Sequence, residues 1–553
     1  MPQLRDTLDF LLYQWLDADA LTAQPRYAEH SRETFDAVLE LAERLARERF
    51  APFNRLVDTE EPRFDGERVQ LPAVTREAVA AYLDAGLLAS GHDYEHGGMQ
   101  LPYVVELAAN AFFFQASIGL SAYAMLTCAN VNLLMALGSQ AQRQAFALPE
   151  LQGRFLGTMC LSEPQAGSSL GDITTRAEPD GPDSEADPLG PRYRLRGNKM
   201  WISGGEHELR ENIVHLVLAK IPGADGRLVP GVKGISLFVV PRVLVDGEGR
   251  LTGERNDVAL AGLNHKLGYR ATVNTLLNFG EGRYPVREAA GAVGYLVGAP
   301  GRGLEAMFHM MNEARINVGM GAAMLGWAGY EASVDYARTR PQSRPAGGAK
   351  DPAAKPVAIV EHADVRRMLL AQRAYSEGGL ALILYCARLV DEKRQASPEE
   401  AADLALLLEL LTPIAKSWPS EWCLEANSLA IQVHGGYGYT RDFPVEQLWR
   451  DNRLNLIHEG THGIQALDLL GRKVPAAGGR GLRLLMARMR QTVARAEGRS
   501  DTAMLGAALA RQLVGLELAT TDLSGADTAA ALANATPYLQ AFGHLVLAWL
   551  WLD

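Results

Sequence analysis

The sequence predicts a multidomain α+β protein in which a β region lies between helical regions. Apolar residues recur every three or four positions up to about residue 155, short apolar runs alternate with turns from about 156 to 285, and long helical stretches follow. A chain of 553 residues is also too long for one core. We therefore expect an N-terminal helical domain (1–155), a middle β domain (156–285), a four-helix bundle (286–474) and an appended helical domain (475–553).

The N-terminal region repeats the apolar face of an amphipathic helix. Leu8, Leu12 and Trp15 have the spacing of one helix face, and residues 34–50, 75–88 and 104–137 show the same period. Residues 92–99 form a polar, glycine-bearing loop between two of these stretches.

The middle region has the pattern of short strands. Residues 193–196, 213–219 and 235–240 are apolar or alternating, and the segments between them are rich in Gly, Pro and Asp. This spacing favours a β-sandwich or barrel. No GxGxxG motif follows a strand and opens a helix here, which argues against a dinucleotide-binding parallel sheet.

The bundle is predicted from long helical stretches at 303–338, 360–392 and 399–425, with a proline-rich loop at 341–356. The methionines of the first stretch, among them Met307, Met310, Met311 and Met320, are interpreted as core. After residue 473 a glycine-rich link, 476–481, leads into amphipathic helices. The last apolar stretch, 538–552, is interpreted as a buried or docking helix, because Gln540, Gly543 and His544 interrupt it.

Composition excludes several classes of partner. The net charge of −11 and the absence of a Lys/Arg run argue against nucleic-acid binding, although a local basic site for a phosphorylated ligand stays open. The four cysteines are scattered without CxxC spacing, which predicts reduced thiols, no metal site and a cytoplasmic location. Neither a signal peptide nor a transmembrane segment is predicted.

Two neighbouring stretches have the residue types of a binding and catalytic site. Residues 432–439 contain three glycines and three aromatic rings, and such glycines let a backbone approach a ligand closely. Residues 451–461 then place the carboxylate of Glu459 in Glu-Gly-Thr, between stretches with helical patterns at 444–456 and 463–470.

Four motifs in order carry a family resemblance: LSEPQAGSSL (161–170), GNKMWISGG (197–205), GGYG (435–438) and EGT (459–461). Together they closely resemble the acyl-CoA dehydrogenase flavoproteins over residues 85–473. The extra helices at both ends are similar to those of the longer bacterial members. The resemblance implies that family's fold, FAD as cofactor, an acyl-CoA substrate, an electron-transfer flavoprotein as electron acceptor, and a homodimer or higher oligomer.

The resemblance also implies the reaction, α,β-dehydrogenation of an acyl-CoA to the trans-2-enoyl-CoA with hydride transfer to flavin N5. An α-C–H beside a thioester is a weak acid, so the site needs a positioned carboxylate and donors to the thioester oxygen. Glu459 matches the family's catalytic base. We expect burial to raise its pKa, and its backbone N–H and a ribityl hydroxyl to be the donors.

The remaining site residues are implied by matching motif positions. Against the flavin ring and along the cofactor we expect Met159, Leu161, Ser162, Gly167, Ser168, Trp201, Ile202, Ser203 and Thr461. For the adenosine half, across a dimer interface, we expect Arg340, Gln342, Gln432, Gly435 and Gly436, and near the acyl-CoA we expect Ser168, Asn312, Arg315 and Gly460.

Several positions depart from the family pattern. His458 stands before the base where Tyr is common, and Gly463 and Ser169 replace a usual Gln and a usual acidic residue. Gln342-Ser343 replaces Thr-Phe, and Ala363 replaces a cofactor-contacting Gln. None removes a group that the chemistry requires. His458 is the most consequential, because its charge could tune the pKa of Glu459.

Two other functions stay open. A flavin oxidase on the same fold would be reoxidised by oxygen and commonly has Asp in place of the Glu, so Glu459 favours the dehydrogenase. A catalytically silent acyl-CoA-binding homologue would be colourless and would show no flavin bleaching.

Overall fold

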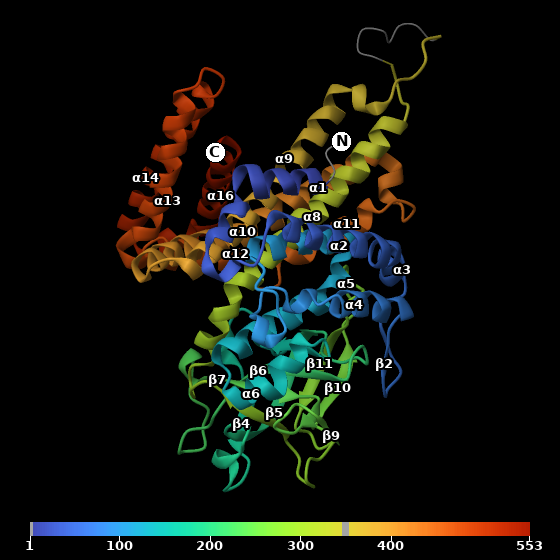
Figure 1. Ribbon diagram of the computed structural model, residues 1–553, viewed down its shortest axis with the longest axis vertical. Helices are drawn as coiled ribbons and strands as arrows, with labels where there is room; N and C mark the ends of the chain where they lie inside the picture. The colour runs from blue at the N-terminus through green and yellow to red at the C-terminus, as the bar shows by residue number, and fades with distance from the viewer. Residues whose placement is uncertain (1–3, 345–352) are drawn as a thin grey trace. The chain divides into compact units, whose positions relative to one another are not determined.

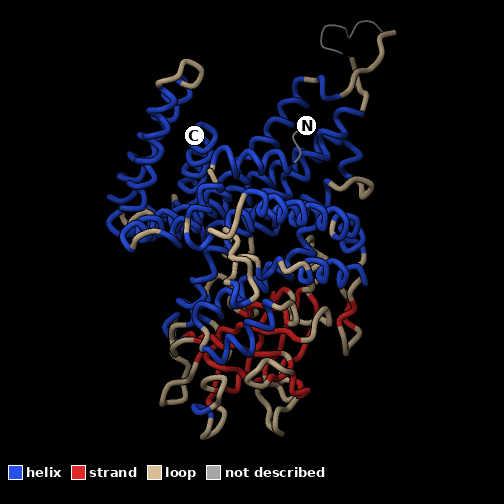
Figure 2. The backbone as a smooth tube through the Cα atoms, in the orientation of Figure 1, coloured by secondary structure: helices blue, strands red, loops and turns tan. Residues whose placement is uncertain are grey.

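The computed structural model describes residues 4–344 and 353–553, without the side chains of residues 309–311. The chain forms two compact units. The helical unit comprises Met1–Glu43, Pro102–Ala116 and Arg315–Asp553, and the β unit comprises Arg44–Leu101 and Ser117–Ala314. All described strands lie in the β unit (Figures 1 and 2), so the predicted α+β class is confirmed. The predicted four-domain boundaries stay predictions.

The β unit is built on one eight-stranded sheet in the order β10-β11-β5-β12-β7-β6-β3, with β4 pairing both β5 and β6. Because β4 joins β5 to β6, the strands β5, β12, β7, β6 and β4 form a closed ring, which agrees with the predicted barrel. The strands are β3 (Phe155–Cys160), β4 (Arg176–Pro179), β5 (Arg192–Ser203), β6 (Asn212–Lys220), β7 (Ile235–Pro241), β10 (Val258–Leu263), β11 (Asn274–Phe279) and β12 (Ala292–Val297).

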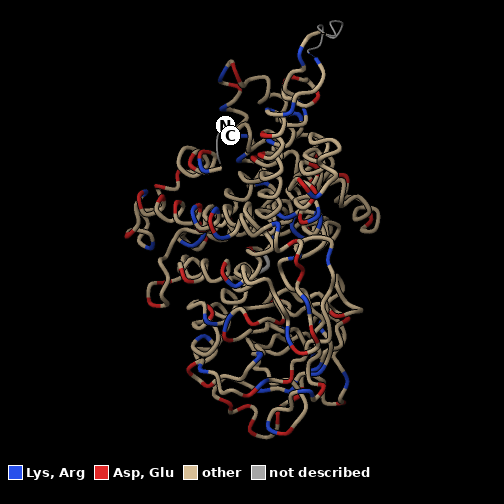
Figure 3. Tube along the Cα trace, turned by 90° about the vertical axis from the view of Figure 1, so that its right-hand side faces the viewer, with Lys and Arg blue, Asp and Glu red and all other residues tan. Residues whose placement is uncertain are grey.

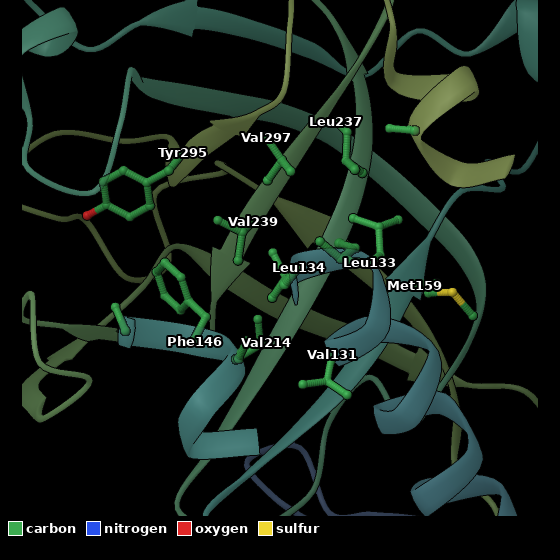
Figure 4. Packing of buried hydrophobic residues seen from close by; sticks show 14 of the residues in the cluster. Val131, Leu133, Leu134, Phe146, Met159, Val214, Leu237, Val239, Tyr295 and Val297 are labelled. Carbon is green, nitrogen blue, oxygen red and sulfur yellow. The ribbon is translucent and has the colours of Figure 1, made fainter. Parts of the chain in front are cut away.

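The strand sequences are apolar because the sheet is covered. Every residue of β3, β6 and β7 is buried, so these strands read as continuous apolar runs rather than as alternation. Figure 4 shows their side chains packed with Val131, Leu134 and Phe146 of the neighbouring helices. This core supports β3, which leads directly into the first predicted flavin motif.

Two short hairpins in the β unit were not predicted: β1 (Arg63–Phe64) with β2 (Val69–Gln70), and β8 (Val243–Val245) with β9 (Leu251–Arg255). The first interrupts the region predicted to be helical. Strands of two residues are too short to leave an alternating pattern, and a side chain fixes the turn, since the Asp65 carboxylate accepts the N–H groups of Glu67 and Arg68.

The helices of the β unit are α3 (Asn54–Thr59), α4 (Ala73–Asp84), most of α5 (Tyr103–Leu137), α6 (Gln140–Gln142), α7 (Leu148–Leu151) and the start of α8 (Gly303–Thr339). α5 has a non-helical residue, Ser117, where the chain passes between units. It is also long and apolar enough to cross a bilayer, but 56% of its most apolar window is buried in protein. We interpret α5 as a core helix.

The helical unit contains the bundle and its appended helices. The bundle elements are the rest of α8, α9 (Ala363–Gln395), α10 (Pro398–His434), α11 (Val445–Asn452) and α12 (His462–Asp468), with α1 (Leu4–Asp9) and most of α2 (Arg32–Arg49). Met307 and Met320 are fully buried, which confirms their interpretation as core. The side chains of Met310 and Met311, and part of the predicted loop 341–356, lie outside the described residues.

Helix α10 contains two prolines in its most buried part. It begins at a capping box, in which Ser397 and Glu400 bond each other's backbone N–H, and it contains Pro413 and Pro419. Proline donates no N–H, so each frees a carbonyl of the preceding turn. A Cβ on Gly319 of α8 would lie 2.1 Å from the Ala415 carbonyl oxygen, so only glycine allows this approach.

The appended region consists of α13 (Ala476–Glu497), α14 (Ala503–Gly525), α15 (Thr528–Ala533) and α16 (Ala535–Leu552). The predicted glycine-rich link has left-handed residues at 477–479, and α16 is buried along one face, as expected of a docking helix. A cavity of about 940 Å³ lies between α14 and α16. None of the predicted site residues lines it.

Charges of both signs are interspersed along each unit (Figure 3). Most ion pairs join side chains that are partly exposed, whereas Lys199–Glu163 and Arg315–Asp468 are almost fully buried. These two pairs lie in the regions of the sequence that carry the predicted site.

Candidate active site

The predicted base lies in a tight turn between two helices. After α11 the chain forms a short 3₁₀ segment, Arg453–Leu456, and then leaves helical geometry. Glu459 and Gly460 both have positive φ, +52° and +90°, and Thr461 then caps α12, its hydroxyl accepting the Ile464 N–H at 3.4 Å. The predicted interruption of the helix at Glu459-Gly460 is therefore confirmed.

Two buried side chains hold this turn by its carbonyl groups. The Lys416 ammonium on α10 donates to the Gly460 carbonyl at 2.8 Å, and the Gln465 amide on α12 donates to the Glu459 carbonyl at 3.0 Å. Both side chains belong to residues that are 0% exposed. A Cβ on Gly460 would lie 2.5 Å from the Gln465 amide nitrogen, so this position also requires glycine.

Burial of Glu459 disfavours the charged form of its carboxyl group. Desolvation raises the pKa of its carboxyl, and the nearby cations of Lys416 and Arg315 partly counteract this rise. Desolvation also lowers the pKa of Lys416 to about 7, while the charge of Glu459 acts in the opposite direction. Glu459 and Lys416 therefore influence each other's ionisation.

Arg315 lies on α8 and forms a buried ion pair with Asp468 of α12, at 2.9 Å. The pair joins α8 to the helix that starts directly after the turn of Glu459. The predicted contact of Arg315 with acyl-CoA stays a prediction, as does that of Asn312, which lies on the same helix within the β unit.

His458 lies at the end of a chain of three hydrogen-bonded asparagine side chains. Asn427 donates to the Leu325 carbonyl at 2.8 Å, Asn452 donates to Asn427 at 2.7 Å, and Asn455 donates to Asn452 at 3.0 Å. The His458 Nε2 atom lies 3.0 Å from the Asn455 side-chain oxygen. This contact holds one nitrogen of the His458 ring against the 3₁₀ segment Arg453–Leu456, and it restrains the residue that precedes Glu459.

In the β unit, the first two motifs are joined by a buried ion pair. The Lys199 ammonium contacts the Glu163 carboxylate and the Leu161 carbonyl, each at 3.0 Å, and the Met200 N–H donates to the Ser162 carbonyl at 3.0 Å. The Glu163 carboxylate also accepts the backbone N–H and hydroxyl groups of residues 174 and 175. Although burial opposes it, Lys199 and these donors hold the pKa of Glu163 at about 2.

Each of the joined motifs carries a residue that is open to solvent. Trp201 is 61% exposed, although the next residue of its strand, Ile202, is buried, and the φ of Trp201 is +66°. Nothing lies within 4 Å of a Cβ placed on Gly167. An exposed indole on one motif and exposed glycine backbone on the other are consistent with contacts to a flavin ring.

The other members of this predicted set differ in exposure. Leu161, Ser162 and Ser203 are partly exposed and Ser168 is exposed, whereas Met159 belongs to the core cluster (Figure 4) and Ile202 is 2% exposed. The Ile202 carbonyl accepts a hydrogen bond from the Thr275 hydroxyl at 2.9 Å, and the Ile202 side chain is buried.

In the helical unit, the residues predicted for the adenosine half lie together. The Arg340 guanidinium stacks over the Tyr437 ring, 5.5 Å from its centre, within the 3₁₀ segment Gly435–Tyr439. Gln342, Gln432, Gly435 and Gly436 are all exposed, and no atom lies within 4 Å of a Cβ placed on either glycine. The cation and the open glycine backbone form a surface that fits an anionic ligand such as a pyrophosphate.

Comparisons with known proteins agree with this geometry. Family models match residues 32–154 (acyl-CoA dehydrogenase, N-terminal domain), 301–474 (acyl-CoA dehydrogenase, C-terminal domain) and 485–553 (acetyl-CoA dehydrogenase C-terminal like). A 3-methylmercaptopropionyl-CoA dehydrogenase of Ruegeria pomeroyi is 38% identical over 97% of this chain and 87% of its own length. The chain belongs to the acyl-CoA dehydrogenase family.

Other relatives extend this result. A broad-specificity linear acyl-CoA dehydrogenase, FadE5 of Mycobacterium tuberculosis, is 32% identical over 97% of this chain and 85% of its own length. A solved acyl-CoA dehydrogenase of Bacillus anthracis in complex with FAD is 19% identical, covers 95% of this chain and 81% of its own, and has a TM-score of 0.72. As a family member, this acyl-CoA dehydrogenase is an oxidoreductase that uses FAD.

Several residues that contact the predicted site residues were not predicted from the sequence: Lys416, Gln465 and Asp468 in the helical unit, and Glu163 and Lys199 in the β unit. Lys416 had a detectable signal, since it is the one lysine within the apolar run 404–418, and a charge in such a run requires a partner. The partner of Arg315 had no such signal, because Asp468 lies 153 residues away in the chain.

Proposed function

We propose that this protein catalyses the FAD-dependent α,β-dehydrogenation of an acyl-CoA thioester to the trans-2-enoyl-CoA. Two relatives that match most of the chain bear the names of acyl-CoA dehydrogenases, one for a thioether-containing acyl group and one for linear acyl groups. The acyl chain length and branching are left open by this proposal.

The observation that carries the proposal is the turn of Glu459. Its left-handed backbone, pinned by Lys416 and Gln465, fixes the direction in which one carboxylate leaves the chain. A general base must be positioned and must have a pKa near the working pH, and desolvation raises the pKa of Glu459 in that direction.

In this reaction the Glu459 carboxylate accepts the α-proton of the thioester. Bound FAD supplies the acceptor for the hydride that leaves the β-carbon. The Glu459 backbone N–H is the chain's donor to the thioester oxygen, where negative charge develops. Among the described residues none accepts a hydrogen bond from this N–H, which supports that role.

The cellular setting is part of the proposal. Electrons leave to an electron-transfer flavoprotein, the enzyme is a homodimer or a higher oligomer, and it works in the cytoplasm in the β-oxidation of fatty or related acids. The partly exposed Arg340 and the exposed glycines 435 and 436 support a ligand shared between subunits, because within one chain no atom lies within 4 Å of a Cβ placed on either glycine.

The test is anaerobic flavin bleaching with linear, branched and thioether acyl-CoA thioesters. The proposal expects a yellow protein whose flavin absorbance is lost with at least one of them and restored by an electron-transfer flavoprotein. Rapid peroxide formation without an added acceptor would identify an oxidase instead. A colourless protein, or one that no thioester bleaches, would favour the silent acyl-CoA-binding homologue.

A further inference from the structure

The residue that links the turn of Glu459 to the bundle is a fully buried lysine. Lys416 lies on α10 between Pro413 and Pro419, and it is the only described side chain that bonds the Gly460 carbonyl. A buried ammonium that makes one hydrogen bond to a neutral carbonyl is costly, so a structural role alone gives a weak reason for a lysine there.

We propose that Lys416 is a positioning residue for the dehydrogenation, because its ammonium pins the Gly460 carbonyl and places a titratable charge beside the Glu459 carboxylate. The inference rests on the proposed function. It assigns to Lys416 two separable effects, one on the geometry of the base and one on its ionisation.

The geometric effect follows from the two hydrogen bonds in the turn. A non-glycine residue in the left-handed region is strained, and here successive carbonyls are each held by a buried donor. Without Lys416 the Gly460 carbonyl loses its donor, and Gln465 alone restrains the turn. A small displacement of a base reduces the rate strongly, since catalysis depends on near-attack geometry.

The electrostatic effect follows from the charges that face Lys416. These are Glu459 in the turn, Arg315 on α8 and His462 on α12, of which Arg315 is paired with Asp468 and His462 lies 3.4 Å from the Glu421 carboxylate. The charged ammonium lowers the pKa of Glu459, and this effect disappears when Lys416 loses its proton near pH 7. The two groups therefore titrate as a coupled pair.

Three substitutions separate the effects. Lys416→Met removes the donor and the charge, Lys416→Gln keeps a donor for the Gly460 carbonyl without charge, and Lys416→Arg keeps a permanent charge. We expect Met to lower the maximal rate of flavin bleaching about 10- to 100-fold. We expect both Met and Gln to move the acidic limb of the pH–rate profile upward by about one unit or more, and Arg to leave that limb near its wild-type position.

The control is Lys473→Met. Lys473 pairs at 3.1 Å with Glu409, which lies on α10 like Lys416, and it does not contact the turn of Glu459. This substitution should leave the maximal rate of flavin bleaching and the acidic limb of the pH–rate profile unchanged. A second readout, independent of turnover, is the infrared carboxylic-acid band of Glu459, obtained as a difference against Glu459→Gln. Its loss with rising pH should occur at higher pH in Lys416→Gln than in the wild type.

The outcomes distinguish this inference from the proposed function. If no acyl-CoA bleaches the wild-type flavin, the proposed function fails. If the wild type is active but Lys416→Gln keeps the wild-type limb and the wild-type infrared titration, the charge role of Lys416 is wrong. If Lys416→Met has the wild-type maximal rate, the positioning role is wrong. Should the Met variant not fold, the Gln and Arg variants and the infrared band still decide.

Discussion

Glu459 combines a strained backbone with a carboxylate whose charge is disfavoured by desolvation. Holding a non-glycine residue in the left-handed region costs on the order of 1–3 kcal/mol, and such residues persist where surrounding contacts fix them. Here Lys416 and Gln465 provide those contacts. The strain is localised at the one side chain that the proposed chemistry requires.

Replacing this base should remove the chemistry and keep the binding. We expect Glu459→Gln to retain its yellow flavin and to bind acyl-CoA, while bleaching slows by about a thousandfold or more, as for loss of a principal catalytic group. Stopped-flow absorbance measures the rate, and calorimetry with a non-reactive enoyl-CoA measures binding. Near-normal bleaching would show that another group is the base.

At the scale of elements, the Arg315–Asp468 pair fixes α12 against α8. Both side chains are almost fully buried, at 4% and 7% exposure, so replacing Arg315 removes the buried partner of the Asp468 carboxylate and leaves it only the more distant, exposed Arg472. We expect Arg315→Met to lower the free energy of unfolding by about 3–5 kcal/mol, measured by urea denaturation. Arg472→Met is the matched control, because Arg472 faces the same carboxylate at 3.6 Å but is 64% exposed. That control should change stability by less than about 1 kcal/mol. Equal losses in both variants would contradict this account.

The pair Glu163–Lys199 joins the two flavin motifs and gives a pH signature. The pKa of Glu163 is lower in the folded protein, about 2, than its ordinary value of 4.5. Its contribution to stability is therefore fully present above about pH 4.5 and is lost as pH falls toward 2. Glu163→Gln should be less stable than the wild type and release flavin more readily at pH 7, with the difference shrinking in acid. Thermal melts at pH 7, 5 and 3.5 measure this, and a difference that does not depend on pH would refute it.

The sequence could predict the site wherever a short motif or a local pattern carried it. The Glu-Gly-Thr turn interrupts the helices as its pattern indicates, the glycines of 435–438 lie in one 3₁₀ segment, and Trp201 is exposed. The residues that support the turn were only partly predictable. A lysine in the apolar run 404–418 requires a partner, but the partner of Lys416, Gly460, lies 44 residues away and could not be identified. The β1–β2 hairpin was missed because its strands are too short for a periodic pattern.

At the scale of the molecule, the chain passes repeatedly between its two units, so the unit boundaries cut through α5 and α8. Periodicity alone detects helices and strands but not which distant segments pack together. The class and order of the elements were therefore predictable, whereas the grouping of residues 102–116 with the bundle was not.

A cofactor shared between subunits would couple FAD binding to assembly. We expect light scattering to give the mass of at least a dimer, and FAD dissociation to increase on dilution as the dimer separates. Arg340→Met should weaken FAD binding about 10- to 100-fold, the value of a hydrogen bond to a charged group. Arg338→Met is the control, because Arg338 is exposed near the end of α8, and this variant should bind FAD as the wild type does. A monomer that retains FAD on dilution would refute the shared site.

The amide chain from Leu325 to His458 has a direction, because every amide donates toward α8 and accepts from the residue after it. The Asn455 oxygen can only accept, so the proton of a neutral His458 must be on Nε2. The bundle thus selects one imidazole tautomer.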